Sequence, residues 1–142
     1  IVVERANRRL FECVIESIGD IEQPSSMLKA AIEAYFRWCE EIGPLAGPIY
    51  AEINDIASPA AFQRSHIIAD LVAVFAEQES RLGLTNADPL LYDALLRAVE
   101  HLGSSAFWPD RLPKVEIARR RKVAIQMALR VVQNNTVSEV KS

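Results

Sequence analysis

The middle of the chain contains a mixture of aromatic and polar side chains that could line a binding site for a small molecule. Several of them are three or four residues apart, a spacing that places two side chains on neighbouring turns of one helix face. Small-molecule sites are mostly apolar, with a few polar groups that fix the orientation of the ligand. Taken singly, each residue also fits ordinary core packing, in which Tyr and Trp keep a polar tip near solvent. The predicted ligand-binding residues are Tyr35, Trp38, Tyr50, Asn54, Phe62, His66 and Tyr92.

Other kinds of chemistry find no support in the sequence. It contains no Gly-rich phosphate loop, no His-Glu-x-x-His and no serine in a strand-to-helix elbow. No two of the cysteines and histidines share the short spacing of zinc ligands. His66 and Asp70 could orient one another four residues apart on a helix, although an exposed pair is the commoner explanation. We therefore expect no enzymatic activity, no metal and no cofactor.

The elements that must position these side chains are helices, and glycine and proline mark their ends. Apolar stretches of helical period close at glycines, which readily adopt the positive φ that follows a last helical turn. Ser58-Pro59 and Asp88-Pro89 pair a capping side chain with a proline at the first helical position. The closing glycines are Gly19, Gly43, Gly83 and Gly103.

These signals predict an all-α fold, with residues 1–142 forming a single helical bundle of six helices. No stretch keeps the period of two that a strand requires. The polar tail from Asn134 is expected to fray. The six predicted helices span residues 2–18, 26–42, 48–56, 59–82, 89–102 and 114–133.

The last two long helices carry more apolar surface than one small domain can cover. Between Val123 and Val132 only Gln126 and Arg130 are polar, so apolar side chains surround nearly the whole helix. One side can face the chain's own core, and we expect a second subunit on the other, in a four-helix dimer interface. The alternative is a central core helix wrapped by the others. The predicted interface residues are Leu91, Leu95, Leu102, Ala124, Met127, Ala128 and Val131.

Composition narrows the class of protein further. Half of the 142 residues are hydrophobic and 25% are charged, which excludes a disordered segment. No apolar run is long enough to span a membrane, so we expect no membrane partner. Two distant cysteines favour a reducing compartment, and we expect the protein to be cytoplasmic. The net charge of −3 argues against these residues being the main nucleic-acid surface.

Two basic groups stand out against that acidic balance. Residues 119–122 read Arg-Arg-Arg-Lys, and consecutive charges on a helix point in different directions, which favours a solvated helix face. Arg5, Arg8 and Arg9 form a second group in the first helix, a better candidate for phosphate contact or for holding a preceding domain.

The order of these elements resembles the ligand-binding and dimerisation domain of the TetR family of transcriptional regulators. Residues 3–10, Val-Glu-Arg-Ala-Asn-Arg-Arg-Leu, resemble the helix that follows the DNA-binding domain of that family. Residues 41–44, Glu-Ile-Gly-Pro, followed by 49–53, Ile-Tyr-Ala-Glu-Ile, resemble its junction between the fifth and sixth helices. The resemblance covers essentially the whole chain, but it is one of layout.

The resemblance implies a function in transcription regulation. Residues 1–18 would be the connecting helix that follows a helix-turn-helix domain lying before Ile1, and that domain would bind operator DNA. The protein would act as a homodimeric repressor whose small apolar or aromatic effector shifts the dimer out of its DNA-binding arrangement. The alternative is a helical homodimeric interaction module without DNA binding.

Overall fold

The chain folds into a helical bundle, as the sequence predicts. The computed structural model describes residues 2–83 and 88–141, without the side chains of residues 2, 44, 46 and 133–141, and the described part contains no strand. The elements are α1 (Val2–Ile18), α2 (Pro24–Ile42), the 3-10 turn η1 (Gly43–Leu45), α3 (Ala46–Asn54), α4 (Pro59–Arg81), α5 (Pro89–Phe107) and α6 (Lys114–Lys141).

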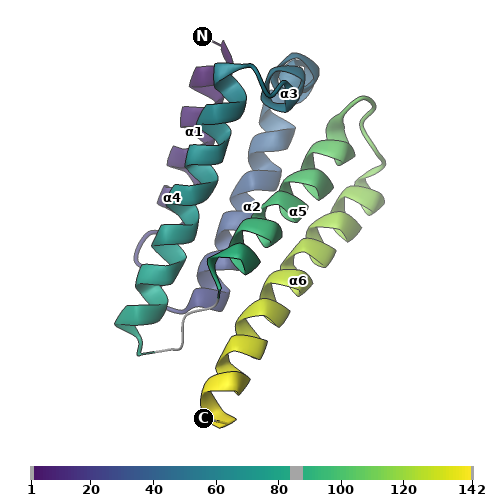
Figure 1. Cartoon of the computed structure of the whole chain (residues 1–142). Coiled ribbons are helices and arrows are strands. Elements are labelled where there is room, and N and C mark those ends of the chain that lie inside the picture. The colour runs from purple at the N-terminus through teal and green to yellow at the C-terminus, as the bar shows by residue number, and fades with distance from the viewer. Residues whose placement is uncertain (1, 84–87, 142) are drawn as a thin grey trace.

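The central helix of the bundle is α2. It contacts α1, α4, α5 and α6, while α1 and α4 pack on one side and α5 and α6 run side by side on the other (Figure 1). The short helix α3 lies at the end of the bundle near the N-terminus (Figure 1). The alternative in which the last helix is wrapped by all the others does not hold, because that position belongs to α2.

The predicted helix ends are mostly confirmed. Gly19, Gly43 and Gly83 have positive φ where α1, α2 and α4 end. The Ser58 hydroxyl accepts a hydrogen bond from the Ala60 backbone N–H, and the Asp88 carboxylate accepts one from Leu90. Both side chains therefore cap their helices as Ser and Asp do at first turns.

Two helix ends lie beyond their predicted positions. The prediction that a helix ends at Gly103 is wrong, since α5 continues to Phe107 with Gly103 buried in its interior. A Cβ at this position would collide with the ring of Tyr35 on α2, so the glycine permits the close approach of two helices. The last helix continues to Lys141 instead of ending at 133, since residues 134–141 include no glycine or proline to stop it.

The apolar surface of α6 is divided between the core and the outside. Gln126 and Arg130 form part of its exposed edge, and the apolar positions beside them are only partly covered. Of the predicted interface residues, Leu91 is exposed, and Leu102, Met127 and Val131 are half-buried. The other three, Leu95, Ala124 and Ala128, are buried within the single chain, so they pack in its own core instead of facing outward.

Candidate ligand-binding site

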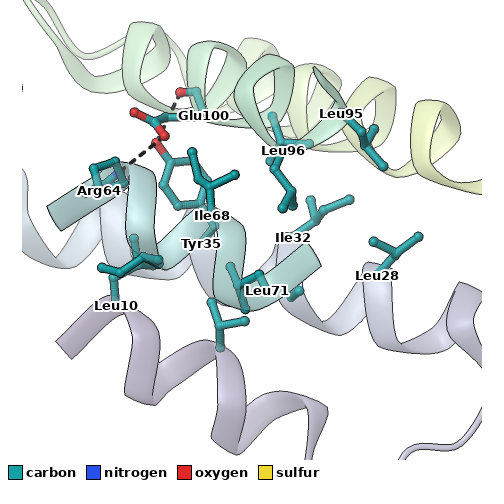
Figure 2. Close-up of a pocket in the computed structure, with 14 residues that line it drawn as sticks. Leu10, Leu28, Ile32, Tyr35, Arg64, Ile68, Leu71, Leu95, Leu96 and Glu100 are labelled. Carbon is teal, nitrogen blue, oxygen red and sulfur yellow. Dashed lines mark hydrogen bonds and ion pairs between the residues drawn. The ribbon is translucent and has the colours of Figure 1, made fainter. Parts of the chain in front are cut away.

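A cavity of about 50 Å³ lies between α1, α2, α4 and α5 (Figure 2). Most of its wall is aliphatic and comes from all four helices. Three polar residues, Tyr35, Arg64 and Glu100, meet at one end of it, and Leu28 and Leu95 lie toward the other (Figure 2). The aliphatic lining consists of Leu10, Val14, Leu28, Ala31, Ile32, Ile67, Ile68, Leu71, Leu95, Leu96 and Val99.

The polar end is organised by Arg64, which is only 4% exposed. Its Nε and Nη2 donate hydrogen bonds to Asn7 Oδ1 on α1, at 3.1 and 2.6 Å. Its Nη1 lies 3.4 Å from Glu100 Oε2 on α5. A single side chain of α4 therefore links α1 to α5 across the end of the cavity, and the carboxylate compensates a charge that would be costly to bury alone.

One nitrogen of this guanidinium keeps unused hydrogen-bonding capacity. Among the described residues, Nη1 is buried and makes no hydrogen bond, even though the Glu100 carboxylate is close enough to form an ion pair. Buried polar groups in folded proteins are nearly always hydrogen-bonded. An orphaned donor at the wall of a cavity is therefore a place where a bound acceptor would gain a partner.

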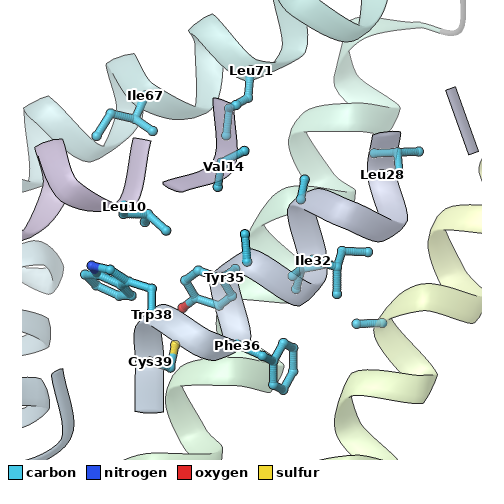
Figure 3. Packing of buried hydrophobic residues seen from close by; sticks show 14 of the residues in the cluster. Leu10, Val14, Leu28, Ile32, Tyr35, Phe36, Trp38, Cys39, Ile67 and Leu71 are labelled. Atoms are coloured by element: carbon cyan, nitrogen blue, oxygen red, sulfur yellow. The ribbon is translucent and has the colours of Figure 1, made fainter. Parts of the chain in front are cut away.

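Aromatic side chains of α2 and α3 lie against the guanidinium. The Arg64 Cζ atom lies 5.4 Å from the centre of the Trp38 ring and 5.9 Å from that of Tyr50, within cation–π range. Trp38 Nε1 donates a hydrogen bond to the Ala6 carbonyl of α1 at 3.1 Å. Figure 3 shows Tyr35 and Trp38 together on the side of α2 that faces Leu10, with Phe36 on the other side.

The hydroxyl groups next to Arg64 are linked to one another. The hydroxyls of Tyr35 and Tyr50 share a hydrogen bond, and the Tyr35 hydroxyl also donates to the Glu100 carbonyl at 3.1 Å. Burial raises the pKa of both tyrosines well above 10, and burial raises the pKa of the Cys39 thiol to about 12. At neutral pH these three groups are therefore uncharged.

Arg64 itself stays charged. Burial alone would lower its pKa, but the Glu100 carboxylate and the two tyrosines favour the cation, and the pKa is raised above the ordinary value of an arginine. The polar end of the cavity therefore combines one cation, one carboxylate and neutral hydroxyls, which suits binding by charge and hydrogen bonds.

The structure separates the seven predicted ligand-binding residues. Tyr35 lines the cavity, while the rings of Trp38 and Tyr50 lie within cation–π range of the Arg64 guanidinium. Tyr92 is buried elsewhere, stacked on Phe75 and hydrogen-bonded to Glu79. The remaining three, Asn54, Phe62 and His66, are exposed.

Phe62 and His66 belong to a different surface. The centres of their rings lie 5.0 Å apart. Both residues line an open groove beside α3 and the start of α1. Asp70 is exposed like His66. Among the described residues no three His, Cys, Asp or Glu side chains gather as they would around a metal ion.

The basic groups are mostly at the surface. Arg119 and Arg120 pair with Glu116 within α6, which fits a solvated helix face for residues 119–122. Arg9 Nε lies 4.0 Å from Glu41 Oε2. Arg5 and Arg8 are exposed. In the part of the chain that is described, no helix combines the length and apolar character required to cross a bilayer.

Sequence reasoning missed the three residues that matter most at the polar end, Asn7, Arg64 and Glu100. A signal for two of them was present. Arg64 shares a helix face with Ala60, Ile67 and Leu71, and Asn7 occurs between Val3 and Leu10 on an apolar stripe of helical spacing. A polar residue on such a stripe must find a buried partner.

Comparisons of the chain with models of protein families, with curated proteins and with solved structures gave no match. The resemblance to the TetR family therefore rests on the layout of the helices and on the short segments that carry it.

Proposed function

We propose that these residues form the effector-binding and dimerisation domain of a ligand-responsive transcriptional repressor of the TetR type. One observation carries the proposal: Arg64 lines the cavity and at the same time donates two hydrogen bonds to Asn7 of α1. In a regulator of this layout, α1 is the helix that would connect the cavity to the DNA-binding domain.

The proposed mechanism follows from the shared guanidinium. A ligand that draws Arg64 toward the cavity weakens its bonds to Asn7, and α1 then moves relative to α4. The ligand must bind this displaced arrangement more tightly than the DNA-binding arrangement, and operator DNA must weaken ligand binding by the same factor.

Dimerisation would use the outer sides of α5 and α6. Leu91, Leu102, Met127 and Val131 retain exposed apolar surface there. A second copy that covers these side chains would remove apolar area from water and bring two DNA-binding domains into a fixed spacing.

The test begins with the reading frame upstream of the codon for Ile1. The proposal requires about 50 residues with two short helices joined by a tight turn. The complete gene product should shift DNA from its own promoter region in an electrophoretic assay. Asn7→Leu removes the bonds that effector is proposed to weaken, so it should bind that DNA more weakly even without effector. Asn54→Leu, at an exposed position of α3, should bind and respond as the original protein does.

A homodimeric interaction module without DNA binding is the second candidate, and the same exposed apolar side chains of α5 and α6 favour it. A dimer whose gene encodes no helix-turn-helix would decide for the module and against the repressor.

A further inference from the structure

The composition of the cavity wall limits the chemistry of its ligand. Eleven of the fourteen lining residues are aliphatic, and Tyr35 supplies the only aromatic ring among them. Flat aromatic ligands are usually held between ring faces, which this wall does not provide. The lining favours an aliphatic chain, in place of the aromatic alternative that the sequence left open.

The size of the cavity limits the ligand further. A water-sized group needs about 10–15 Å³ of such space, so about 50 Å³ accommodates roughly three to five of them. Drug-sized ligands occupy sites of about 300 Å³ or more. The chain that fits is therefore a short one.

The polar end selects the head group. Among the residues that the structure describes, Nη1 of Arg64 is a charged, buried donor that makes no hydrogen bond, so it needs an acceptor and repels a cation. A carboxylate is the best match for a guanidinium, because hydrogen bonds between ionised partners are about twice as strong as neutral ones. The Tyr35 hydroxyl is already bonded to Tyr50 and Glu100 and leaves Arg64 as the main determinant.

Glu100 is the group that such a ligand would replace. Its side chain is 20% exposed, against 4% for Arg64, so it can turn toward solvent when another carboxylate reaches Nη1. The exchange keeps the buried cation compensated and avoids two carboxylates at one site, which would repel each other.

We infer that the cavity binds a short aliphatic carboxylic acid of about three to five carbons, with its carboxylate on Arg64 and its chain among Ile68, Leu96 and Val99. This inference rests on the proposed function, since it names the class of effector for the same cavity. The Glu100 carboxylate competes with the acid for Arg64 and so lowers the affinity of the cavity for the acid.

The test is an NMR titration of the ¹⁵N-labelled chain with sodium butyrate, butan-1-ol and butylamine. Butyrate should bind at least about tenfold more tightly than the alcohol or the amine, a difference expected for a charge-assisted bond. The amide shifts should centre on Arg64, Leu96 and Glu100. Affinity should rise from acetate to butyrate and fall again at octanoate, which is too long for the cavity.

The informative variant is Glu100→Gln, which removes the competing carboxylate while keeping the side chain's size. Butyrate should bind this variant at least about fivefold more tightly than the original chain. Glu40→Gln is the matched control: it removes the same charge from an exposed pair with Arg111, away from the cavity, and should leave the affinity unchanged. Arg64→Met should abolish binding, and the Glu100 variant keeps the test valid if the Arg64 variant does not fold.

Three outcomes would overturn the inference: no acid binds either the original chain or Glu100→Gln, the alcohol or amine binds as well as butyrate, or Glu100→Gln fails to tighten binding. None of them affects the proposed regulator, which depends on the upstream helix-turn-helix and on DNA binding. Conversely, butyrate binding by a protein without that domain would support this ligand class and remove the regulator.

Discussion

Arg64 occupies a position on α4 where the helical spacing favours an apolar side chain, and the cost of burying it explains the residues around it. Asn7 supplies an acceptor, Glu100 supplies the countercharge, and the rings of Trp38 and Tyr50 provide favourable faces. Removing one partner of such a group leaves the others buried and unpaired, which costs more than the net value of the interactions themselves.

Arg64→Leu should therefore lower the free energy of unfolding by about 2–4 kcal/mol, near the low end of the range for buried pairs because Glu100 can reach water. Arg97→Leu is the control, since it breaks the exposed pair with Asp93 and should cost no more than about 1 kcal/mol. Urea denaturation measures both. Equal losses in the two variants would contradict the structural role assigned to Arg64.

The raised pKa of Cys39 predicts a loss of stability in alkali. Below pH 9 the thiol is protonated in folded and unfolded chains alike, and its contribution is complete. As the pH rises from the ordinary value of 9.0 toward about 12, only the unfolded chain releases the proton, so the free energy of unfolding falls. Tyr35 and Tyr50 act in the same direction.

Urea denaturation at about pH 8 and about pH 10.5 should show this decline. Cys39→Ala should reduce the difference between the two pH values, whatever it does to stability at each of them. Cys13→Ala keeps the buried thiol and should show the same decline as the original chain. An identical decline in Cys39→Ala would mean that the thiol makes no contribution.

At the scale of elements, the contact between α2 and α5 depends on the absence of a side chain at Gly103. Its closest neighbour is the ring of Tyr35, whose hydroxyl is held by Tyr50 and Glu100 and cannot easily move. The same contact places Tyr35 at the wall of the cavity. The sequence pattern predicted a helix end at Gly103, but α5 is continuous through this position, and the glycine allows the two helices to pack closely.

Gly103→Ala should destabilise the protein by about 1–2 kcal/mol, because overpacking of about 1–3 kcal/mol outweighs the gain of up to about 1 kcal/mol in helix propensity. Gly47→Ala in α3 is the matched control. Its new Cβ would meet the indole of Trp108, which is 43% exposed and can turn into solvent. Thermal unfolding should give a lower Tm for the first variant only, and an unchanged Tm there would show that the helices can separate freely.

At the scale of the whole molecule, the outer sides of α5 and α6 keep apolar surface that the rest of the chain does not cover. The expectation of a dimer came from an apolar circumference in the sequence, and the structure leaves part of that surface half-exposed. The burial of each predicted interface residue decides whether a substitution there can test dimerisation. Leu95 is 4% exposed and packs inside the single chain, whereas Met127 is half-buried and keeps surface that a second subunit could cover.

Light scattering at micromolar concentration should find a dimer for the original chain and a folded monomer for Met127→Glu, whose new carboxylate would be buried at the interface without a partner. Leu95→Glu places the same charge in the core of the single chain and should abolish folding, as circular dichroism would show. Gln126→Glu, at an exposed position of the same helix, should remain dimeric. A monomeric original chain would remove the dimer from the proposal.

Much of the fold could be predicted from the sequence. The first helix was predicted with its observed ends, and Pro59 and Pro89 marked the starts of α4 and α5, because caps, glycines and prolines act locally. The candidate site was predicted only in part. Of seven residues Tyr35 alone lines the cavity, since aromatic side chains at helical spacing look the same whether they face a cavity, the core or solvent.

The sequence by itself determined that the chain is helical and roughly where each helix begins, because those properties depend on neighbours a few residues apart. Only the tertiary structure decided that α2 is central, that Gly103 faces Tyr35, and that Arg64 meets both Asn7 and Glu100. Arg64 and Asn7 lie 57 positions apart in the sequence, and Gly103 and Tyr35 lie still farther apart. Which polar residue compensates a buried charge depends on how helices pack, and that is a property of the whole bundle.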